Sequence, residues 1–361
     1  MVLMMFLMFG LVGAVSANNG FGVVANSNTN NIQFIDPETN ETTGPWLAGQ
    51  LGSYGGGLFD VAITPDGKTA FVSNFGDSKV FCIDISGGFN AAPVLLTPKG
   101  VRVGFFAEDM VITPDGKYVL VTDGGFSARA AVISIYDNGI IAPYLLKINN
   151  LGTRYANAVD ITPDGKTVLV ADYFSGCAYS YALQNDGTLV YINTARMSPF
   201  RPVNVTISPD GQTAIMAIAG YSALVALAID DTGLIYKTTH IAMPFRNGQS
   251  CVFNSEGTKA YYLSNSQNGG TKVVVLNVTG PGDVSPTGTN ITVKPMRGTS
   301  QLFGVDSIAL SPDENYLYVT NPTLSGGIAG INVIDLTLNT KVDDIKANGI
   351  PTGIAFTTIE E

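Results

Sequence analysis

The chain has 361 residues and a formal net charge of −10, with a pI near 4.5 and 13% charged residues. Nucleic acids and anionic membranes are bound by clustered basic surface, so we expect neither as a partner. His240 is the single histidine and no Gly-x-Ser-x-Gly motif occurs, which argues against serine hydrolase chemistry and histidine-rich copper chemistry.

The first residues have the composition of a targeting segment. Residues 1–17 are almost wholly apolar, and Val15-Ser16-Ala17 fits a signal-peptidase site. The run lacks Lys and Arg and is short for a membrane span. We therefore expect residues 1–17 to be a signal peptide or an uncleaved anchor. Residues 18–361 should then form one exported domain (periplasmic, extracellular or on the cell surface) with no membrane span.

One phrase recurs along the chain at a spacing of about 50 residues, which indicates an array of a single supersecondary unit. Its clear copies read Asp60-Val-Ala-Ile-Thr-Pro-Asp-Gly67, Asp109-Met-Val-Ile-Thr-Pro-Asp-Gly116 and Ala158-Val-Asp-Ile-Thr-Pro-Asp-Gly165. Weaker copies begin at Asn204, Ser250 and Ser307, with an echo at Gly353. The phrase predicts an apolar strand followed by a type I turn, in which aspartate bonds the neighbouring backbone and glycine takes the left-handed conformation.

Each unit reads as four short strands without helical periodicity, which is the pattern of a β-propeller blade. Complete blades begin near Leu58, Ala107, Ala156, Pro202, Gly248 and Val305. The segments Phe21–Asn26 and Asn31–Asp36 look like strands two and three of a further blade, and the C-terminus supplies its strand one. The sequence therefore predicts an all-β, seven-bladed propeller of four antiparallel strands per blade, closed by pairing of Ile354 with residues 22–25.

The three cysteines, Cys82, Cys177 and Cys251, fall in different blades. Residues on separate blades are too far apart for disulfide geometry, so we expect buried free thiols. No Cys-x-x-Cys-His motif and no zinc-ligand spacing occur, so covalent haem and structural zinc are not expected.

The repeat resembles that of a known group. Tyr318-Val-Thr-Asn321 follows Ser311-Pro-Asp313 in the last complete blade, and Phe71-Val-Ser-Asn74 and Val121-Thr-Asp123 are related copies. The pattern is similar to the YVTN-type β-propeller repeats of surface-layer and exported proteins. It is also similar to the seven-bladed lactonases, which include 6-phosphogluconolactonase-like and carboxymuconate-cyclising enzymes. The resemblance implies the fold. It carries little about activity, because the shared motif lies in the scaffold and the rim histidine of the carboxymuconate-type enzymes is missing.

Ligands of propellers usually meet the rim at which strand one begins, here called the top rim. Several arginines fall in the crossings between blades that reach this rim: Arg102, Arg154, Arg201, Arg246 and Arg297. Three of them are followed or preceded by an aromatic residue: Tyr155, Phe200 and Phe245. Because a guanidinium matches carboxylate or phosphate and stacks on rings, this set predicts a site for an anionic ligand. The alternative is that these arginines pair with acids of the rim and lock neighbouring blades.

Oxygen-bearing side chains recur at the same level, at Asp60, Glu108, Asp109, Asn157, Asn204, Gln249 and Asp306. Converging oxygens can hold a hard divalent ion, so Asp60, Asp109, Asn157 and Asn204 are candidate ligands for Ca²⁺ on the channel axis. The alternative is hydrogen bonding within the ring, in which case no cofactor is needed. Loops between strands two and three add Asp77, Asp123, Arg129, Asp172, Tyr173, Phe174 and Tyr221 to this rim.

These features favour a non-catalytic propeller that binds a protein, a carbohydrate or a small anionic ligand on its top rim, or packs into a surface assembly. The second hypothesis is a lactonase-type hydrolase acting on an anionic sugar lactone or a carboxylated lactone. In that case the rim arginines would orient the substrate. Glu108 or Asp306 would act as the general base or as a metal ligand.

Overall fold

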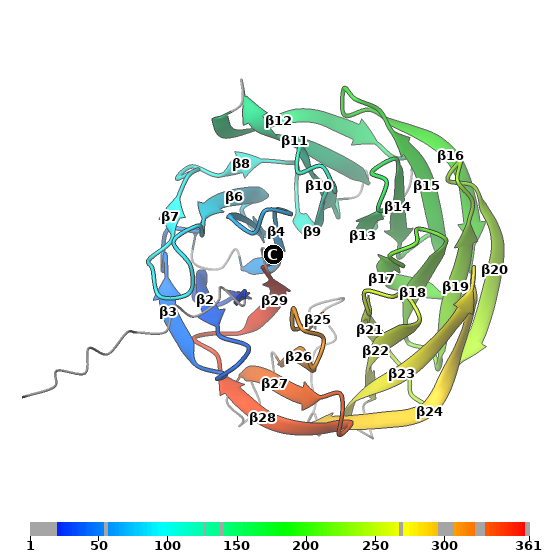
Figure 1. Cartoon of the computed structure of the whole chain (residues 1–361). Coiled ribbons are helices and arrows are strands. Elements are labelled where there is room, and N and C mark those ends of the chain that lie inside the picture. Colours follow the sequence, from blue (N-terminus) through cyan, green and yellow to red (C-terminus); the bar gives the residue numbers. More distant parts are fainter. Residues whose placement is uncertain are drawn as a thin grey trace, which may run out of the picture.

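The computed structural model describes residues 20–53, 57–125, 128–137, 140–152, 154–266, 270–294, 307–321 and 329–357. These residues form seven antiparallel sheets. Each sheet is a row of four hydrogen-bonded strands, and one sheet has a fifth strand at its side. Figure 1 shows the sheets arranged radially in a ring. The described residues contain no helix, and hence none that could span a membrane. The prediction of an all-β, seven-bladed propeller is confirmed.

The first three blades have the following strands. Blade one contains β29 (Pro351–Phe356), β1 (Gly22–Asn26), β2 (Asn31–Ile35) and β3 (Thr42–Trp46). Blade two contains β4 (Leu58–Ile63), β5 (Thr69–Asn74), β6 (Lys79–Asp84) and β7 (Val94–Leu95), and β8 (Val101–Arg102) also pairs with β6. Blade three contains β9 (Ala107–Ile112), β10 (Tyr118–Asp123), β11 (Arg129–Asp137) and β12 (Ile140–Asn150).

The other four blades repeat this order. Blade four contains β13 (Ala156–Ile161), β14 (Thr167–Asp172), β15 (Cys177–Leu183) and β16 (Leu189–Arg196). Blade five contains β17 (Arg201–Ile207), β18 (Thr213–Ala219), β19 (Ala223–Ile229) and β20 (Ile235–Ala242). Blade six contains β21 (Gly248–Phe253), β22 (Lys259–Ser266), β23 (Gly270–Gly280) and β24 (Asp283–Lys294). Blade seven contains β25 (Ile308–Leu310), β26 (Tyr316–Asn321), β27 (Gly330–Asp335) and β28 (Thr340–Lys346).

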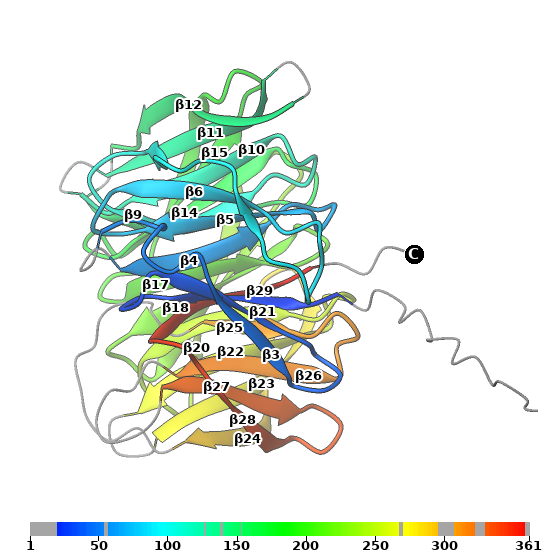
Figure 2. The same ribbon diagram turned by 90° about the vertical axis from the view of Figure 1, so that its left-hand side faces the viewer.

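The two ends of the chain share blade one. The C-terminal strand β29 is its inner strand and pairs with β1, with Ile354 opposite Val24, which confirms the predicted pairing of Ile354 with residues 22–25. β29 also contacts β25 of blade seven and β4 of blade two, so the innermost strands touch one another around the ring. The strands run from rim to rim, as the side view shows (Figure 2).

The hydrophobic core lies between neighbouring blades. One buried cluster joins Ile215 and Leu224 of blade five to Tyr262 and Val274 of blade six, and each of the other interfaces has a cluster of the same kind. Strands buried on both faces are nearly continuous in apolar residues, as in β18 and β19. Apolar burial between the blades is therefore the main force that closes the ring.

The Thr-Pro-Asp-Gly phrase forms the predicted turn. The Asp66 carboxylate accepts hydrogen bonds from the Thr64 hydroxyl (2.6 Å) and the Lys68 N–H (3.1 Å), and Gly67 has a φ of +68°. The turns lie on the rim opposite the top rim. A side-chain carbon at Gly116 would meet the proline of the preceding turn, Pro65, so successive turns also pack against each other.

The last residue of strand two explains the Asn or Asp that recurs in the repeat. At the top rim the Asp172 carboxylate accepts the Arg154 N–H (2.6 Å), and the Asn74 amide donates to the Leu51 carbonyl (2.8 Å). In both cases the side chain holds the crossing that leads into its own blade. The recurring Asn or Asp is thus a scaffold feature that shapes the top rim.

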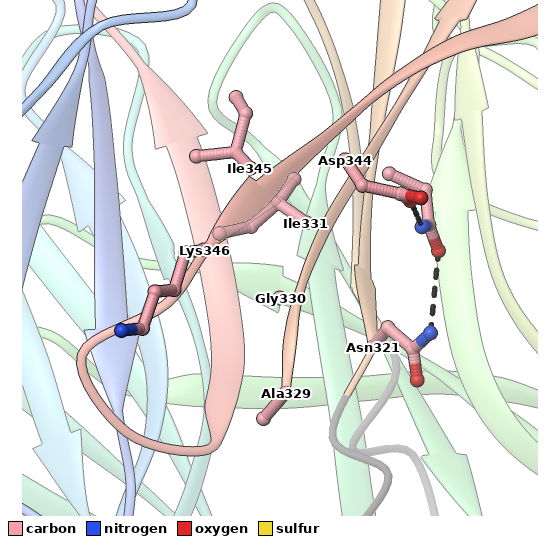
Figure 3. Close-up of a pocket in the computed structure, with 8 residues that line it drawn as sticks. Asn321, Ala329, Gly330, Ile331, Asp344, Ile345 and Lys346 are labelled. Atoms are coloured by element: carbon pink, nitrogen blue, oxygen red, sulfur yellow. Dashed lines mark hydrogen bonds between the residues drawn. The ribbon is translucent and has the colours of Figure 1, made fainter. Parts of the chain in front are cut away.

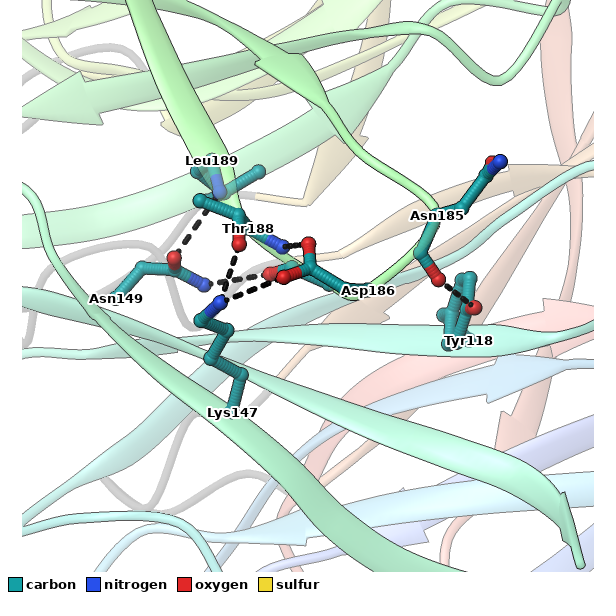
Figure 4. A network of polar contacts seen from close by, with 8 residues as sticks. Tyr118, Lys147, Asn149, Asn185, Asp186, Thr188 and Leu189 are labelled. Atoms are coloured by element: carbon teal, nitrogen blue, oxygen red, sulfur yellow. Dashed lines mark hydrogen bonds and ion pairs between the residues drawn. The ribbon is translucent and has the colours of Figure 1, made fainter.

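Hairpins between strands three and four clamp onto the preceding blade. Figure 4 shows the turn of blade four held against β12, where Asn149 donates to the Gly187 carbonyl (2.9 Å) and accepts the Leu189 N–H (3.0 Å). Lys147 pairs with Asp186 of the same turn at 3.0 Å. Asn193 makes the equivalent pair of bonds to Ile235 of blade five.

Removal of the closing strand should destroy the ring. A chain truncated after Ile350 lacks β29, so the inner face of blade one and its contacts with blades two and seven are lost. We expect it to lose the cooperative thermal transition in circular dichroism. Truncation after Thr357 is the control and should leave the transition near that of the full chain. A cooperative transition in the shorter chain would contradict closure by β29.

Candidate functional site

The inner strands of blades one to six carry a β-bulge at their top end, which changes the direction of one side chain. The pairing of β9 with β10 and of β13 with β14 shifts register at this point. The residue five positions before the turn Thr or Ser falls in the bulge, and it points toward the next blade. Thr352 bonds the Leu58 carbonyl (3.0 Å) in this way, and Glu108 bonds Tyr155. Bulges of this kind commonly position side chains next to functional sites.

Glu108 lies in the crevice between blades three and four and is only 3% exposed. Its carboxyl accepts a hydrogen bond from the Tyr155 hydroxyl and lies against Gly124, where any side chain would collide with it. Burial raises the pKa of Glu108 to about 8. The Tyr155 hydrogen bond lowers that pKa, and the nearby charge of Asp123 adds to its rise. Glu108 is therefore mostly protonated at neutral pH.

Asp123 anchors the crossing into blade three. Its Oδ1 accepts the N–H groups of Phe105 (3.1 Å), Phe106 (2.9 Å) and Gly125 (3.2 Å). Its Oδ2 lies 3.6 Å from the Arg129 Nε, and the Arg129 guanidinium stacks 4.8 Å from the centre of the exposed Phe105 ring. Asp123 thus holds an arginine and an aromatic ring at the rim.

An arc of aromatic rings runs from Glu108 to Arg201 across blades four and five. Tyr155 makes an edge contact with Phe174 (5.3 Å between ring centres), and Phe174 makes one with Tyr173 (5.2 Å). The Arg201 guanidinium lies 5.3 Å from the centre of the Tyr173 ring, and its Nη1 donates to the Tyr173 hydroxyl at 3.4 Å. We call these four residues, Tyr155, Phe174, Tyr173 and Arg201, the rim arc. Phe174 is 55% exposed and Arg201 is exposed, whereas Tyr173 is only 7% exposed, so Phe174 and Arg201 are the solvent-facing part of the arc.

The other predicted arginines differ in their placement. Arg154 is exposed beside the rim arc, and Arg246 is exposed and donates to the Gly220 carbonyl (2.6 Å). Arg102 is exposed in β8, which pairs with β6 away from the ring axis. Arg297 and Asp306 lie outside the described residues.

The remaining predicted aromatics extend the rim surface. Phe200 packs edge-on against Tyr221 and against His240, both at 5.0 Å between ring centres. Phe245 lies under Lys272, whose ammonium is 5.8 Å from the ring centre. His240 is exposed on β20, the outermost strand of blade five, as expected.

Three aspartates of consecutive inner strands face one another across the blade interfaces. Asp60 accepts the Met110 N–H (3.0 Å), Asp109 the Val159 N–H (2.8 Å) and Asp160 the Ile207 N–H (2.7 Å). Each therefore bonds the inner strand of the next blade. Asp160 was missed by the sequence reasoning, although a carboxyl inside an apolar strand marks it within the repeat phrase.

Burial raises the pKa of these carboxyls, although each keeps some contact with solvent. The pKa of Asp60 rises to about 6 and that of Asp160 to about 7, while backbone N–H groups oppose the rise. Burial and the adjacent charge of Asp60 hold the pKa of Asp109 well above its usual range.

The predicted metal ligands Asp60, Asp109, Asn157 and Asn204 lie on the inner strands of four consecutive blades. Asn204 lies on β17 and accepts the Thr206 hydroxyl (3.2 Å), and Asn157 is buried on β13. Within the described residues, no three Asp, Glu, His or Cys side chains are grouped as metal ligands would be. An axial Ca²⁺ ion stays a prediction. Cys82, Cys177 and Cys251 are buried and free.

A pocket of about 290 Å³ lies in blade seven (Figure 3). It is lined by Asn321, Ala329, Gly330, Ile331, Asn332, Asp344, Ile345 and Lys346. Asn332 donates to the Asp344 carboxylate and accepts a hydrogen bond from the Asn321 amide (3.4 Å). None of the residues predicted for the site lines this pocket.

No family profile matches the sequence, and no curated protein matches it. Solved structures match its fold. A protein of unknown function from Desulfotomaculum acetoxidans DSM 771 is 20% identical with a TM-score of 0.72, and the match covers 94% of this chain and 99% of that one. A protein of Bacteroides fragilis NCTC 9343, provisionally assigned as a 6-phosphogluconolactonase, is 15% identical with a TM-score of 0.70 over 95% of this chain and 99% of that one. The periplasmic gluconolactonase of Pseudomonas aeruginosa is 15% identical with a TM-score of 0.64 over 94% and 99%. The likeness shows the fold, that of the 6-phosphogluconolactonase-like seven-bladed propellers.

The raised pKa of Asp160 predicts a stability that depends on pH. The native carboxyl holds its proton up to about pH 7, whereas the unfolded one releases it near the ordinary pKa of 3.8. Native stability therefore falls as the pH rises from about 4 through 7. Asp160→Asn removes this pH dependence but loses one of the two backbone N–H bonds that the carboxyl accepts, so its melting temperature relative to the wild type should be a few degrees more favourable at pH 8 than at pH 4. Equal differences at pH 4 and pH 8 in calorimetry would contradict the assignment.

Proposed function

We propose that the top rim binds a small anionic ligand through the rim arc. The observation that carries the proposal is the placement of Arg201, an exposed guanidinium stacked on Tyr173 and continuous with the exposed Phe174 ring. Stacking fixes the plane of the guanidinium and leaves edge N–H groups for a carboxylate or phosphate. Aromatic faces beside it suit the apolar face of a sugar or a short carbon chain.

The surroundings of the rim arc support a ligand more than an inter-blade lock. Among the described residues, Arg201 makes no salt bridge and is held only by the Tyr173 ring and a long hydrogen bond to its hydroxyl. An arginine that locked two blades would pair with a carboxylate of the neighbouring blade, as Arg129 pairs with Asp123 inside blade three. The names of the similar structures include a gluconolactonase, and this supports a sugar-acid type of anion.

Replacement of Arg201 tests this function. Arg201→Met keeps much of the apolar stem but removes the charge. We expect the ligand-induced rise in melting temperature, measured with millimolar sodium gluconate, to fall by more than half. Arg102→Met on β8 is the matched control and should respond like the wild type. Equal responses of all three proteins would refute anion binding by the rim arc.

Lactone hydrolysis is a second candidate function, which Glu108 and the likeness to lactonases support. A carboxyl that is protonated at neutral pH suits a proton donor to a leaving alcohol more than the base expected from the sequence. Glu108 is only 3% exposed, however, so a substrate has little access to its carboxyl, and this favours binding without catalysis. We therefore expect no turnover of gluconolactone or aryl lactones, with or without added Ca²⁺. Turnover that Glu108→Gln abolishes would establish a hydrolase instead.

The export of the protein and its membership of the YVTN-type repeat group are also proposals. The apolar residues 1–17 support export, and the Ser/Thr-Asx ends of strand two support a YVTN-type repeat. An exported propeller with this rim could present the rim arc to a soluble metabolite, a carbohydrate or a protein of a surface assembly. Detection of the chain outside the cytoplasm in its own host would test the export.

A further inference from the structure

We propose that Asn157 accepts a hydrogen bond from a hydroxyl group of the ligand, so that the rim arc binds a hydroxy acid more tightly than a carboxylate without hydroxyl groups. This inference rests on the proposed function and deepens it. It starts from one buried amide. Asn157 is 6% exposed, and its side-chain oxygen has no hydrogen-bond partner within the described chain. A buried acceptor without a donor is costly, so such a group usually has a partner that the protein alone does not supply.

The repeat fixes where this amide points. Asn157 occupies in β13 the bulge position that Glu108 occupies in β9, five residues before the threonine of the turn. Thr352 and Glu108, at the same position, both reach into the crevice with the next blade. Asn157 therefore points into the crevice between blades four and five.

The same correspondence places Asn157 beneath the rim arc. Tyr155 caps Glu108, and the residue equivalent to Tyr155 in the next blade is Arg201, seven residues before the turn serine. Gly124, which lies against the Glu108 carboxyl, corresponds to Tyr173. The crevice above Asn157 is thus covered by Arg201 and Tyr173, the two residues whose stacking defines the anion site.

The two crevices differ in their hydrogen bonding. Between blades three and four, Glu108 and Tyr155 satisfy each other. Between blades four and five, the Asn157 oxygen and the Arg201 guanidinium lie in the equivalent places, and among the described residues no hydrogen bond joins them. A ligand that carries an acid and a nearby hydroxyl fits both: its carboxylate binds Arg201 and its hydroxyl donates to Asn157.

Calorimetric titration of two matched anions tests the inference. Gluconate and hexanoate have the same charge and chain length, and differ in their hydroxyl groups. We expect the wild type to bind gluconate about tenfold more tightly, the effect of one hydrogen bond to a buried acceptor. Asn157→Leu should bind both anions alike, with its hexanoate affinity unchanged. It should also melt at or above the wild-type temperature, because the unpaired amide is gone.

Asn149→Leu is the control for Asn157→Leu. Asn149→Leu removes an amide whose oxygen and nitrogen are both bonded, as Figure 4 shows, so it should melt lower and keep the preference for gluconate. If Asn157→Leu does not fold, Asn157→Ala carries the same test. A preference for gluconate that survives in the Asn157 variant overturns the role of Asn157 alone. Failure of the wild type to bind either anion overturns the proposed function and this inference together.

Discussion

Burial between neighbouring blades is the constraint on which the structure depends. A four-stranded sheet with apolar residues on both faces cannot bury them alone, and here each blade is covered by two others. The ring must therefore close, and β29 closes it by pairing with β1. Polar contacts then fix the register of one blade on the next, through the Asp60, Asp109 and Asp160 carboxylates near the axis and the Asn149 and Asn193 amides at the periphery.

The same constraint explains why the site lies between blades. The inner strands of blades one to six each carry a bulged residue at the equivalent position, so the ring offers a series of similar crevices. At two of these positions the side chain is satisfied within the fold: Thr352 bonds a backbone carbonyl and Glu108 bonds Tyr155. The position of Asn157 beneath Arg201 and Tyr173 departs from that rule. A departure from consistent pairing within a regular repeat is where function is expected.

Much of the fold could be predicted from the sequence because the repeat phrase couples an apolar strand to a turn of defined chemistry. The period predicted the blade count, and the partial units at the two ends predicted that Ile354 pairs with residues 22–25, where the structure places it opposite Val24. The direction of individual side chains could not be predicted, because a single bulge changes which face a residue takes and leaves no mark in composition. Glu108 and Asp109 are adjacent, yet one bonds Tyr155 and the other the Val159 N–H.

The candidate site was predicted in part for the same reason. Arg201, Tyr155, Tyr173 and Phe174 were predicted for the top rim, and the structure brings them into one arc. Arg102 was predicted for the same site but lies in β8, away from the rim arc. The fourth strand of blade two is short, so the crossing that follows it pairs with β6. Packing between two blades decides which arginine stacks on an aromatic ring. The sequence could not predict this contact, because the two residues lie far apart in the chain.

The central claim is that the rim arc between blades four and five holds an anionic ligand. The most direct measurement is a crystal structure of the protein soaked in gluconate. The account predicts electron density for the carboxylate against Arg201 and for a hydroxyl within hydrogen-bond distance of Asn157. Density for the ligand on the channel axis near Asp60 and Asp109, or an empty rim arc at saturating gluconate, would contradict it.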